Sequence, residues 1–502
     1  MRTFDYPFNE LFNKGLIPDI NSIHNGNYCT YIRHAKPTKK GLTSTVLQLD
    51  SNKSTEYQYF MLQSGMYAFS GSTLYQVDIT TDIYTAILSN IPIGAYSWSM
   101  ADFGTYALFG NGSTYIVYSN GVFSINSSIM PLAGTMAFFK GRVLLGDVYN
   151  YLGTVRETNK LIWSDIGNIS FLSINTTDIT YKNTAGFTYL LNQSTIIKIV
   201  PMGDNCIIYT NNAIYAVYNA TVGNTNTLGI RQIADIGLVG SRAIIENDKL
   251  NPTIHWFIGT DYQLYSIDNK LNLTPIGYNE YIKNIPGIID TLSWCGGNTS
   301  IPAITSPILS YNTHLKELHI SDFLSGITYV LTEQGMGMME GVIYAVIPNS
   351  KSNYGLFIAG KISISSTYPS IDIVSDIIDF DYSGLKSIEY IDFSMHNNRQ
   401  VQVSIEYRDS KLSQYSISPC MIVNNEGFVK LCVRGIDFRI RIHTEVRNSG
   451  YVSSVYGTGP YGTGPYGIYD TNKGWEKVSI SKIKIGIKSI DKRYIRGINI
   501  KK

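Results

Sequence analysis

Apolar and polar residues alternate with a period of two along most of the chain, in short segments rich in Ile, Val, Tyr and Thr. Gly, Asn, Asp and Ser separate these segments, which is typical of short antiparallel strands joined by tight turns. One unit recurs: an apolar strand, a small polar turn, and a strand in which Tyr is flanked by aliphatic residues. It is clearest at residues 68–77, 108–117, 207–217 and 256–267. We therefore expect an all-β fold in which each copy forms a hairpin.

The spacing of these hairpins predicts how the strands are grouped. The repeated tyrosines are Tyr75, Tyr115, Tyr215 and Tyr265, and with the strand around Trp163 they give intervals of 40 to about 52 residues. Weaker copies occur at residues 317–331 and 342–365. A period of this length with several strands per unit is typical of propeller blades. The sequence thus predicts a β-propeller of six to seven irregular blades over residues 56–366. The alternative is a pair of β-sandwiches whose hairpins are periodic by chance.

The pattern changes to longer alternating strands after about residue 371. In the segment 481–488, Ile483 and its i+2 neighbours share one face, whereas Lys482, Lys484 and Lys488 share the other. One face is therefore expected in a core and the other in solvent. We predict a separate C-terminal β-sandwich over residues 367–502.

Two segments are expected to lie outside regular blades. Residues 456–467 repeat Tyr-Gly-Thr-Gly-Pro and predict an exposed loop, either a contact loop at an interface through Tyr456, Tyr461 and Tyr466 or a simple insertion at a hairpin tip. Residues 1–55 are expected to form an N-terminal arm with the first strands, joining a blade or a neighbouring molecule. Their basic cluster at 33–40 is either a phosphate contact or a solvated loop.

Composition excludes several classes of protein. Hydrophobic residues make up 44% of the 502 residues and charged residues 16%, with 38 Tyr, which excludes a disordered chain and a long coiled coil. Lys plus Arg is 40 against 38 for Asp plus Glu, so the chain lacks the overall charge of a tight nucleic-acid binder. With no membrane-spanning apolar run, no signal peptide and five cysteines without metal or redox spacing, we expect a soluble protein made in a cytosol with free thiols.

No motif carries an evident catalytic chemistry. His314 and His319 lack the spacing of a zincin motif, and the turn after Trp163 is only superficially similar to the Asp-box of propeller glycosidases. Carboxylates such as Asp376 and Asp379, or Asp78 and Asp82, are explained by chance spacing in a chain with 38 acidic residues. We therefore predict no enzyme, no catalytic residue, no metal ligand and no cofactor.

The basic excess is C-terminal. Residues 371–502 contain 19 Lys and Arg against 14 Asp and Glu. Arg439 and Arg441 share one side of their strand, as Lys482, Lys484 and Lys488 do of theirs. If those strands adjoin, the five side chains form a basic face that contacts DNA phosphates or an acidic partner. The alternative is an ordinary solvated face, partly balanced by nearby carboxylates such as Glu389, Asp392 and Glu406.

The order of these segments resembles the tail nozzle proteins of short-tailed bacteriophages, also called packaged-DNA stabilisation or tail accessory proteins. The stretches that carry the resemblance are 141–146 leading to 161–168, 197–204 followed by 207–210, 236–240 followed by 255–259, and 433–442 continuing to 483–488. The resemblance covers most of the chain, but it does not extend to the repeat at 456–467 or to the N-terminal arm.

The resemblance implies a virion structural protein, assembled in the bacterial cytoplasm. Such a protein forms a sixfold ring below the portal and adaptor proteins, continues the DNA conduit, retains packaged DNA and docks tail fibres or spikes. Near-neutral charge suits a conduit, because a lumen dense in Lys and Arg would hold the genome. Two other functions remain open: a receptor- or glycan-binding propeller with aromatic platforms, and a propeller glycoside hydrolase.

Overall fold

The structure is a computed structural model that describes part of the chain. The described residues are 4–8, 12, 14–18, 27–39, 41–45, 57–78, 83–94, 96–104, 106–126, 131–149, 155–169, 171, 184–191, 194–222, 225–247, 252–285, 307–313, 315–322, 324–347, 355–358, 361–362, 370–380, 384–393, 401–424, 426–444, 479–480 and 483–489. The chain divides into two compact units. Unit 1 comprises residues 1–49, 328–340 and 364–502, and unit 2 comprises residues 50–327 and 341–363.

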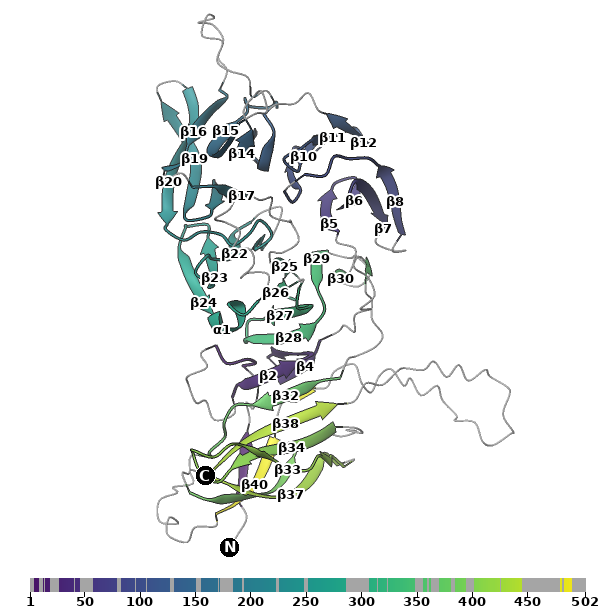
Figure 1. The fold of residues 1–502 in the computed structure, drawn as a ribbon, viewed down its shortest axis with the longest axis vertical. Coiled ribbons are helices and arrows are strands. Elements are labelled where there is room, and N and C mark those ends of the chain that lie inside the picture. The colour runs from purple at the N-terminus through teal and green to yellow at the C-terminus, as the bar shows by residue number, and fades with distance from the viewer. Residues whose placement is uncertain are drawn as a thin grey trace, which may run out of the picture. The chain divides into compact units, whose positions relative to one another are not determined.

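Unit 2 is a succession of antiparallel sheets in chain order (Figure 1). Five sheets have four strands each. The first contains β5 (Gln58–Leu62), β6 (Gly65–Ser70), β7 (Thr73–Asp78) and β8 (Ile83–Leu88), and the second contains β9 (Ser99–Asp102), β10 (Tyr106–Gly110), β11 (Tyr115–Ser119) and β12 (Val122–Asn126). The third contains β13 (Ala133–Phe139), β14 (Arg142–Tyr149), β15 (Arg156–Trp163) and β16 (Gly186–Tyr189), the fourth β17 (Ile196–Met202), β18 (Asn205–Thr210), β19 (Ile214–Val222) and β20 (Thr225–Ala234), and the fifth β21 (Ile244–Glu246), β22 (Ile254–Ile258), β23 (Leu264–Asp268) and β24 (Leu273–Gly277).

The short helix α1 (Asn279–Ile282) follows the fifth sheet. Unit 2 then continues with the hairpin of β25 (Ile308–Asn312) and β26 (Glu317–Asp322), and with a sheet of β29 (Ile343–Ile347), β30 (Gly355–Ile358) and β31 (Lys361–Ile362). Among the described residues, no helix has the length and apolar character needed to span a bilayer.

The sheets of unit 2 close a ring. First strands of successive sheets contact one another, as β9 does β13 and β13 does β17, and further along the chain β25 contacts β29. Strand β29 in turn contacts β5, so the last sheet meets the first. This is the arrangement of a β-propeller. The predictions of an all-β chain and of a propeller are confirmed.

The predicted hairpins are the two middle strands of their sheets. The four clear copies correspond to β6–β7, β10–β11, β18–β19 and β22–β23, each paired in antiparallel register. The recurring tyrosine lies on the third strand of each sheet. In two of these sheets its hydroxyl donates a hydrogen bond to a carbonyl outside the sheet, from Tyr115 to Pro131 at 2.6 Å and from Tyr215 to Leu191 at 3.2 Å. The tyrosine therefore joins a blade to the segment beside it while its ring stays buried.

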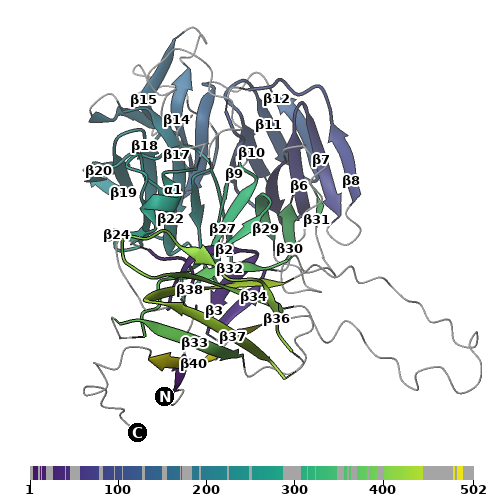
Figure 2. The ribbon, with the colours of Figure 1, turned by 60° about the horizontal axis from the view of Figure 1, so that its bottom comes forward.

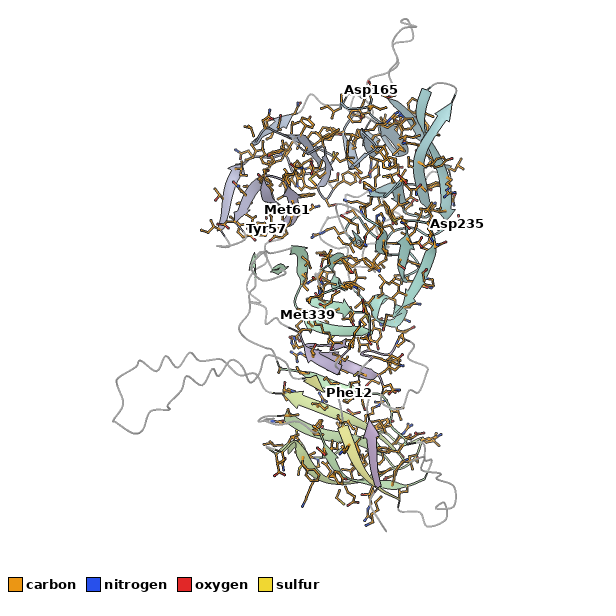
Figure 3. All side chains as sticks on the ribbon, turned by 180° about the vertical axis from the view of Figure 1, so that it is seen from behind. Phe12, Tyr57, Met61, Asp165, Asp235 and Met339 are labelled. Carbon is orange, nitrogen blue, oxygen red and sulfur yellow. The ribbon has the colours of Figure 1, made fainter. Side chains whose placement is uncertain are left out.

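The core of unit 2 lies between sheets. A cluster that includes Leu108, Met136 and Leu145 joins the second and third sheets, and other clusters join the first to the second and the third to the fourth. The first sheet also packs on Ile308 of β25 in a cluster that Tyr57 and Met61 border (Figure 3). Since apolar burial is the main favourable term in folding, each blade depends on its neighbours for stability.

Unit 1 contains three sheets (Figure 2). The first has the strand order β1 (Phe4–Phe8), β40 (Ile483–Ser489), β33 (Lys386–Asp392), β37 (Phe428–Gly435). The second runs from β2 (Cys29–Arg33) through β32 (Asp372–Ser375), β38 (Asp437–Thr444) and β34 (Val401–Arg408), at whose edge β35 (Ser416–Ile417) and β36 (Met421–Ile422) pair. The third contains β27 (Ile327–Leu331), β28 (Met336–Glu340), β3 (Ala35–Thr38), β4 (Gly41–Ser44) and β39 (Ser479–Ile480).

The first two sheets of unit 1 have the alternation of a sandwich. Every second residue of β37 and β38 is buried, including Phe438, Ile440 and Ile442, and Lys386 of the first sheet lies 6.0 Å from the ring of Phe438 in the second. The N-terminal segment, expected as an arm on a blade or neighbour, instead supplies β1 and β2. These strands pair with β40 and β32, so residues far apart in sequence build the same sheets.

A buried histidine joins the fourth and fifth blades. Nδ1 of His255 accepts a hydrogen bond from the hydroxyl of Tyr209 at 3.0 Å, and Nε2 donates to the carbonyl of Pro201 at 3.1 Å. Both rings are fully buried. Burial lowers the pKa of His255 to about 4 from its ordinary 6.5, although Glu246 and the bond to Pro201 act in the opposite direction. The folded protein therefore holds this imidazole neutral.

We predict that stability falls as the pH is lowered from 6.5 towards 4. In this window the unfolded chain binds a proton at His255 that the folded chain excludes, which removes up to about 3 kcal/mol of unfolding free energy. Denaturant unfolding of the wild type and of His255→Gln at several pH values measures this loss of unfolding free energy. The variant should be less stable at pH 7 but show a shallower pH dependence. Equal slopes for the two proteins would contradict the assignment.

Candidate functional site

The structure places the predicted basic residues in two different sheets of unit 1. Arg439 and Arg441 lie on β38, whereas Lys484 and Lys488 lie on β40. Lys482 lies outside the described residues, as do the predicted interface tyrosines Tyr456, Tyr461 and Tyr466. The two strands do not adjoin, so the condition for a single basic face is not met. The outward residues of the two sheets lie on opposite faces of the sandwich.

Arginines on the outer face of the β38 sheet are each held by a carboxylate. Arg441 binds Asp372 through two hydrogen bonds, from Nη2 at 2.7 Å and from Nε at 3.2 Å. The other three pairs are Arg33–Glu340 at 2.6 Å, Arg408–Asp437 at 2.6 Å and Arg439–Glu406 at 3.6 Å. We call these four pairs the ion-pair ladder.

Cross-strand register explains why these pairs form. Glu406 lies directly opposite Arg439 in the pairing of β34 with β38, and Asp372 is one diagonal step from Arg441 across β32. Opposite charges at such positions attract each other on one sheet face. The hydrogen bond with Asp372 raises the pKa of Arg441, and the hydrogen bond from Arg33 lowers the pKa of Glu340. The charged forms of both partners are thus stabilised.

An aromatic ring extends the ladder. Tyr415 is close to two guanidinium groups, with Cζ of Arg439 4.3 Å and Cζ of Arg408 4.9 Å from its ring centre. Cations over a tyrosine face are attracted by the ring quadrupole. Four arginines, four carboxylates and one ring therefore form a face whose charges cancel locally. A DNA phosphate would have to displace a carboxylate from each arginine.

The opposite face of the sandwich differs in charge. Lys484 of β40 is exposed and Lys488 half-buried, and β37, on the other side of β33, adds the exposed Lys430 and Arg434 at outward positions. Lys488 and Arg434 both pair in register with Ser387, which places them on either side of one central residue. Asp392 of β33 lies directly opposite Lys484 in register. We call these four cations the basic stripe. The alternation of β37 is visible in the sequence, but the sequence analysis did not name Lys430 and Arg434 as site residues.

A second site missed from the sequence lies on the outermost strand of the third blade. Phe187 and Tyr189 on β16 are 59% and 49% exposed. Lys160 of β15 lies 4.7 Å from the ring centre of Phe187 and 5.2 Å from that of Tyr189. Glu157 accepts hydrogen bonds from Lys160 at 2.7 Å and from the hydroxyl of Tyr189 at 2.6 Å. We call these four residues the aromatic cluster.

The electrostatics of the aromatic cluster favour a fixed geometry. Burial acts to raise the pKa of Glu157, but the hydrogen bonds from Lys160 and Tyr189 outweigh it and lower the pKa. For Lys160, burial acts to lower the pKa and the bond to Glu157 raises it overall. Both groups are charged at neutral pH and hold the two rings, which is the preorganisation that favours binding.

The turn after Trp163 is structural. Asp165 accepts hydrogen bonds from the hydroxyl of Thr184 at 2.6 Å, from its amide at 3.0 Å and from the amide of Ile166 at 2.9 Å. The indole of Trp163 donates to the carbonyl of Thr184 at 3.1 Å. These bonds, led by that of the Thr184 hydroxyl, lower the pKa of Asp165. Asp165, labelled in Figure 3, therefore fastens the segment before β16.

The other candidate chemical groups are dispersed. His319 is buried, with Nε2 3.7 Å from a carboxylate oxygen of Glu317, and His314 and Asp82 lie outside the described residues. Among the residues that the structure describes, no group of three or more His, Cys, Asp or Glu side chains is arranged to hold a metal ion. The cysteines in this part of the chain, Cys29, Cys206, Cys420 and Cys432, are free thiols.

Comparisons with known proteins give weak likenesses. No family model matches the chain, and no curated protein matches it significantly. The extracellular domain of BT4673 from B. thetaiotaomicron is 13% identical, with 73% of this chain and 43% of that chain covered and a TM-score of 0.37. AztD from Citrobacter koseri is 11% identical, with 61% and 96% covered and a TM-score of 0.30.

The dihydro-heme d1 dehydrogenase NirN is 10% identical, with 65% of this chain and 64% of that chain covered and a TM-score of 0.34. The chain spans less than half the length of the BT4673 domain. Likeness at this level carries no argument about function.

We predict that the two faces of the sandwich differ in DNA binding. Replacing Lys484 and Lys488 by Gln should weaken binding to duplex DNA and reduce the slope of log K against log salt by up to about 2, because two phosphate contacts are lost. Arg439→Gln with Arg441→Gln removes the same charge but should leave the slope unchanged, since these arginines already bind carboxylates. Fluorescence anisotropy over a salt series measures both. Equal effects of the two double variants would show that only net charge matters.

Proposed function

We propose that this protein is a non-enzymatic structural component that assembles with copies of itself into a ring through which duplex DNA passes, as a tail nozzle protein of a short-tailed bacteriophage. The observation that carries the proposal is the charge distribution over the sandwich. One face consists of arginines already bound to carboxylates, and the other has a small group of cations, with Asp392 directly opposite Lys484 in register. The sequence resemblance, which spans both predicted domains, supports the same function.

A conduit needs weak contact with phosphates. Every phosphate that a cation neutralises adds salt-dependent affinity, so an array of available arginines would slow a moving duplex. The ion-pair ladder removes four arginines from such an array. The basic stripe retains enough charge for transient, non-specific contact with the genome or with an acidic partner.

We propose that the protein lies in the virion tail, below portal and adaptor proteins, with fibres or spikes docked on its outside. Exposed apolar side chains can serve in such contacts, and several lie on strands, including Ile83, Val122 and Ile417.

We predict a sixfold ring with an opening wide enough for duplex DNA. Light scattering over a concentration series gives the absolute mass, and negative-stain microscopy gives the shape, with and without neighbouring virion proteins. A ring should appear under at least one of these conditions. A compact monomer under all of them would overturn the proposal and favour the second candidate function.

The second candidate is a receptor- or glycan-binding propeller, and the aromatic cluster favours it. Phe187 and Tyr189 present exposed rings beside one carboxylate and one ammonium group. A sugar ring can place its C–H groups on such a surface and its hydroxyls on the charged groups. Aromatic side chains are also common anchors where proteins bind proteins.

We predict for this second function that Phe187→Ala weakens binding to a glycan identified on a broad panel by about tenfold, or about 1.4 kcal/mol. Phe187→Tyr keeps the aromatic ring and should retain binding. Calorimetric titration of both variants measures the difference. Failure of the wild-type protein to bind any glycan on the panel would remove this candidate.

A further inference from the structure

A buried hydroxyl lies on β33, an inner strand of the first sheet of unit 1. Ser387 is 3% exposed, and among the residues that the structure describes no group forms a hydrogen bond with its Oγ. Burying a hydroxyl without a hydrogen bond costs free energy, so such a group in a folded protein is commonly explained by a bound ligand, ion or water. The surroundings of Ser387 indicate which of these it binds.

The register places this hydroxyl between two cations. Ser387 lies directly opposite Arg434 of β37 on one side and directly opposite Lys488 of β40 on the other. Residues directly opposite each other in antiparallel strands project from the same face, with Cβ atoms about 5 Å apart. Arg434 is exposed and Lys488 half-buried, so this face is the outer face of the sheet. We call Lys488, Ser387 and Arg434 the Ser387 row.

The Ser387 row differs from the ion-pair ladder in the residue that lies opposite the arginine. In the ladder, Arg439 lies opposite the carboxylate Glu406, which pairs with it at 3.6 Å. Arg434 lies opposite Ser387 instead, and a serine hydroxyl carries no charge. The register therefore gives the middle of this row a hydrogen-bond donor between two cations, where the ladder has an anion.

Two carboxylates of β33 lie further along the same strand. Asp392 lies opposite Lys484, and Glu389 lies at the register shift between Ile388 and Tyr390. Neither carboxylate is directly opposite Arg434 or Lys488. Glu389 is the closer of the two to Ser387 along the strand, so it is the group that would oppose an anion bound in the row.

We infer that the Ser387 row binds one phosphate group. Lysine and arginine donate charge-assisted hydrogen bonds to phosphate oxygens, and the serine hydroxyl donates one more. The long stems of Lys488 and Arg434 can cover the hydroxyl while their charged groups stay in solvent, and they can part to admit an anion. The phosphate is either free or part of a DNA backbone. The row lies within unit 1 of one chain, so this inference goes beyond the proposed function and does not depend on a ring.

Titration calorimetry with inorganic phosphate tests the inference on a set of single variants. Ser387→Ala removes the hydroxyl, whereas Ser387→Thr keeps it. Arg434→Gln and Lys488→Gln each remove one charge from the row. The matched control is Lys411→Gln, because it removes the charge of an exposed lysine of unit 1 that lies outside the row. Thermal unfolding with and without phosphate shows that each variant folds.

We expect the wild type to bind phosphate, and Ser387→Ala, Arg434→Gln and Lys488→Gln each to weaken this binding by about tenfold. Ser387→Thr and Lys411→Gln should bind as the wild type does, and Glu389→Gln should bind more tightly. Without phosphate, Ser387→Ala should be at least as stable as the wild type, because it removes a buried hydroxyl that has no partner. Phosphate should raise the Tm of the wild type more than that of Ser387→Ala.

Two results would overturn the inference: a wild type that does not bind phosphate, or a Ser387→Ala variant that binds it as tightly as the wild type, which would show attraction by charge alone. Duplex DNA in phosphate-free buffer identifies the source of the phosphate. Weaker DNA binding by Ser387→Ala, with competition by free phosphate, supports a backbone phosphate, whereas unchanged DNA binding supports free phosphate. A monomeric wild type that binds phosphate overturns the proposed ring and leaves this site intact.

Discussion

Burial between neighbouring sheets is the constraint on which the propeller depends. Each blade of unit 2 covers its faces with the blades before and after it, and clusters such as that around Leu144, Ile196 and Tyr215 lie between two sheets rather than within one. Among the residues that the structure describes, no further strand pairs with the outermost strands β8, β12, β16, β20 and β24 of the five four-stranded sheets. The edges of these strands differ, because β20 carries Arg231 and β24 carries Pro275, whereas β8, β12 and β16 carry neither a charged residue nor a proline.

Local structure was predictable because both strands of a hairpin lie within one short segment. The alternation and turn residues at 68–77 or 256–267 specify two strands and the turn between them without reference to the rest of the chain. The N-terminal strands were not predictable in this way. Strand β1 pairs with β40, and no local pattern in residues 4–8 indicates a partner at residues 483–487.

The candidate site was likewise predictable only where it depends on the pattern within one strand. Alternation on β38 correctly places Arg439 and Arg441 on one face, but the carboxylates that bind them come from other strands. Because pairing and register depend on the folded sheet, the sequence indicates a basic face where the structure has an ion-pair ladder. The alternation of Phe187 and Tyr189 was also visible in the chain. Only the structure shows that their strand is outermost, and that Lys160 and Glu157 hold both rings.

The pairing of β1 with β40 has a consequence for how the protein is made. Translation completes the strands of the first five propeller sheets at residue 277, whereas the sheet that contains β1 has to wait for residues 483–489. Domains generally fold during synthesis as their residues emerge, so the propeller strands are available long before the sandwich can close. A ribosome that stops early releases a chain whose β1 has no partner strand. Only chains translated as far as β40 can therefore complete the sheet that contains β1.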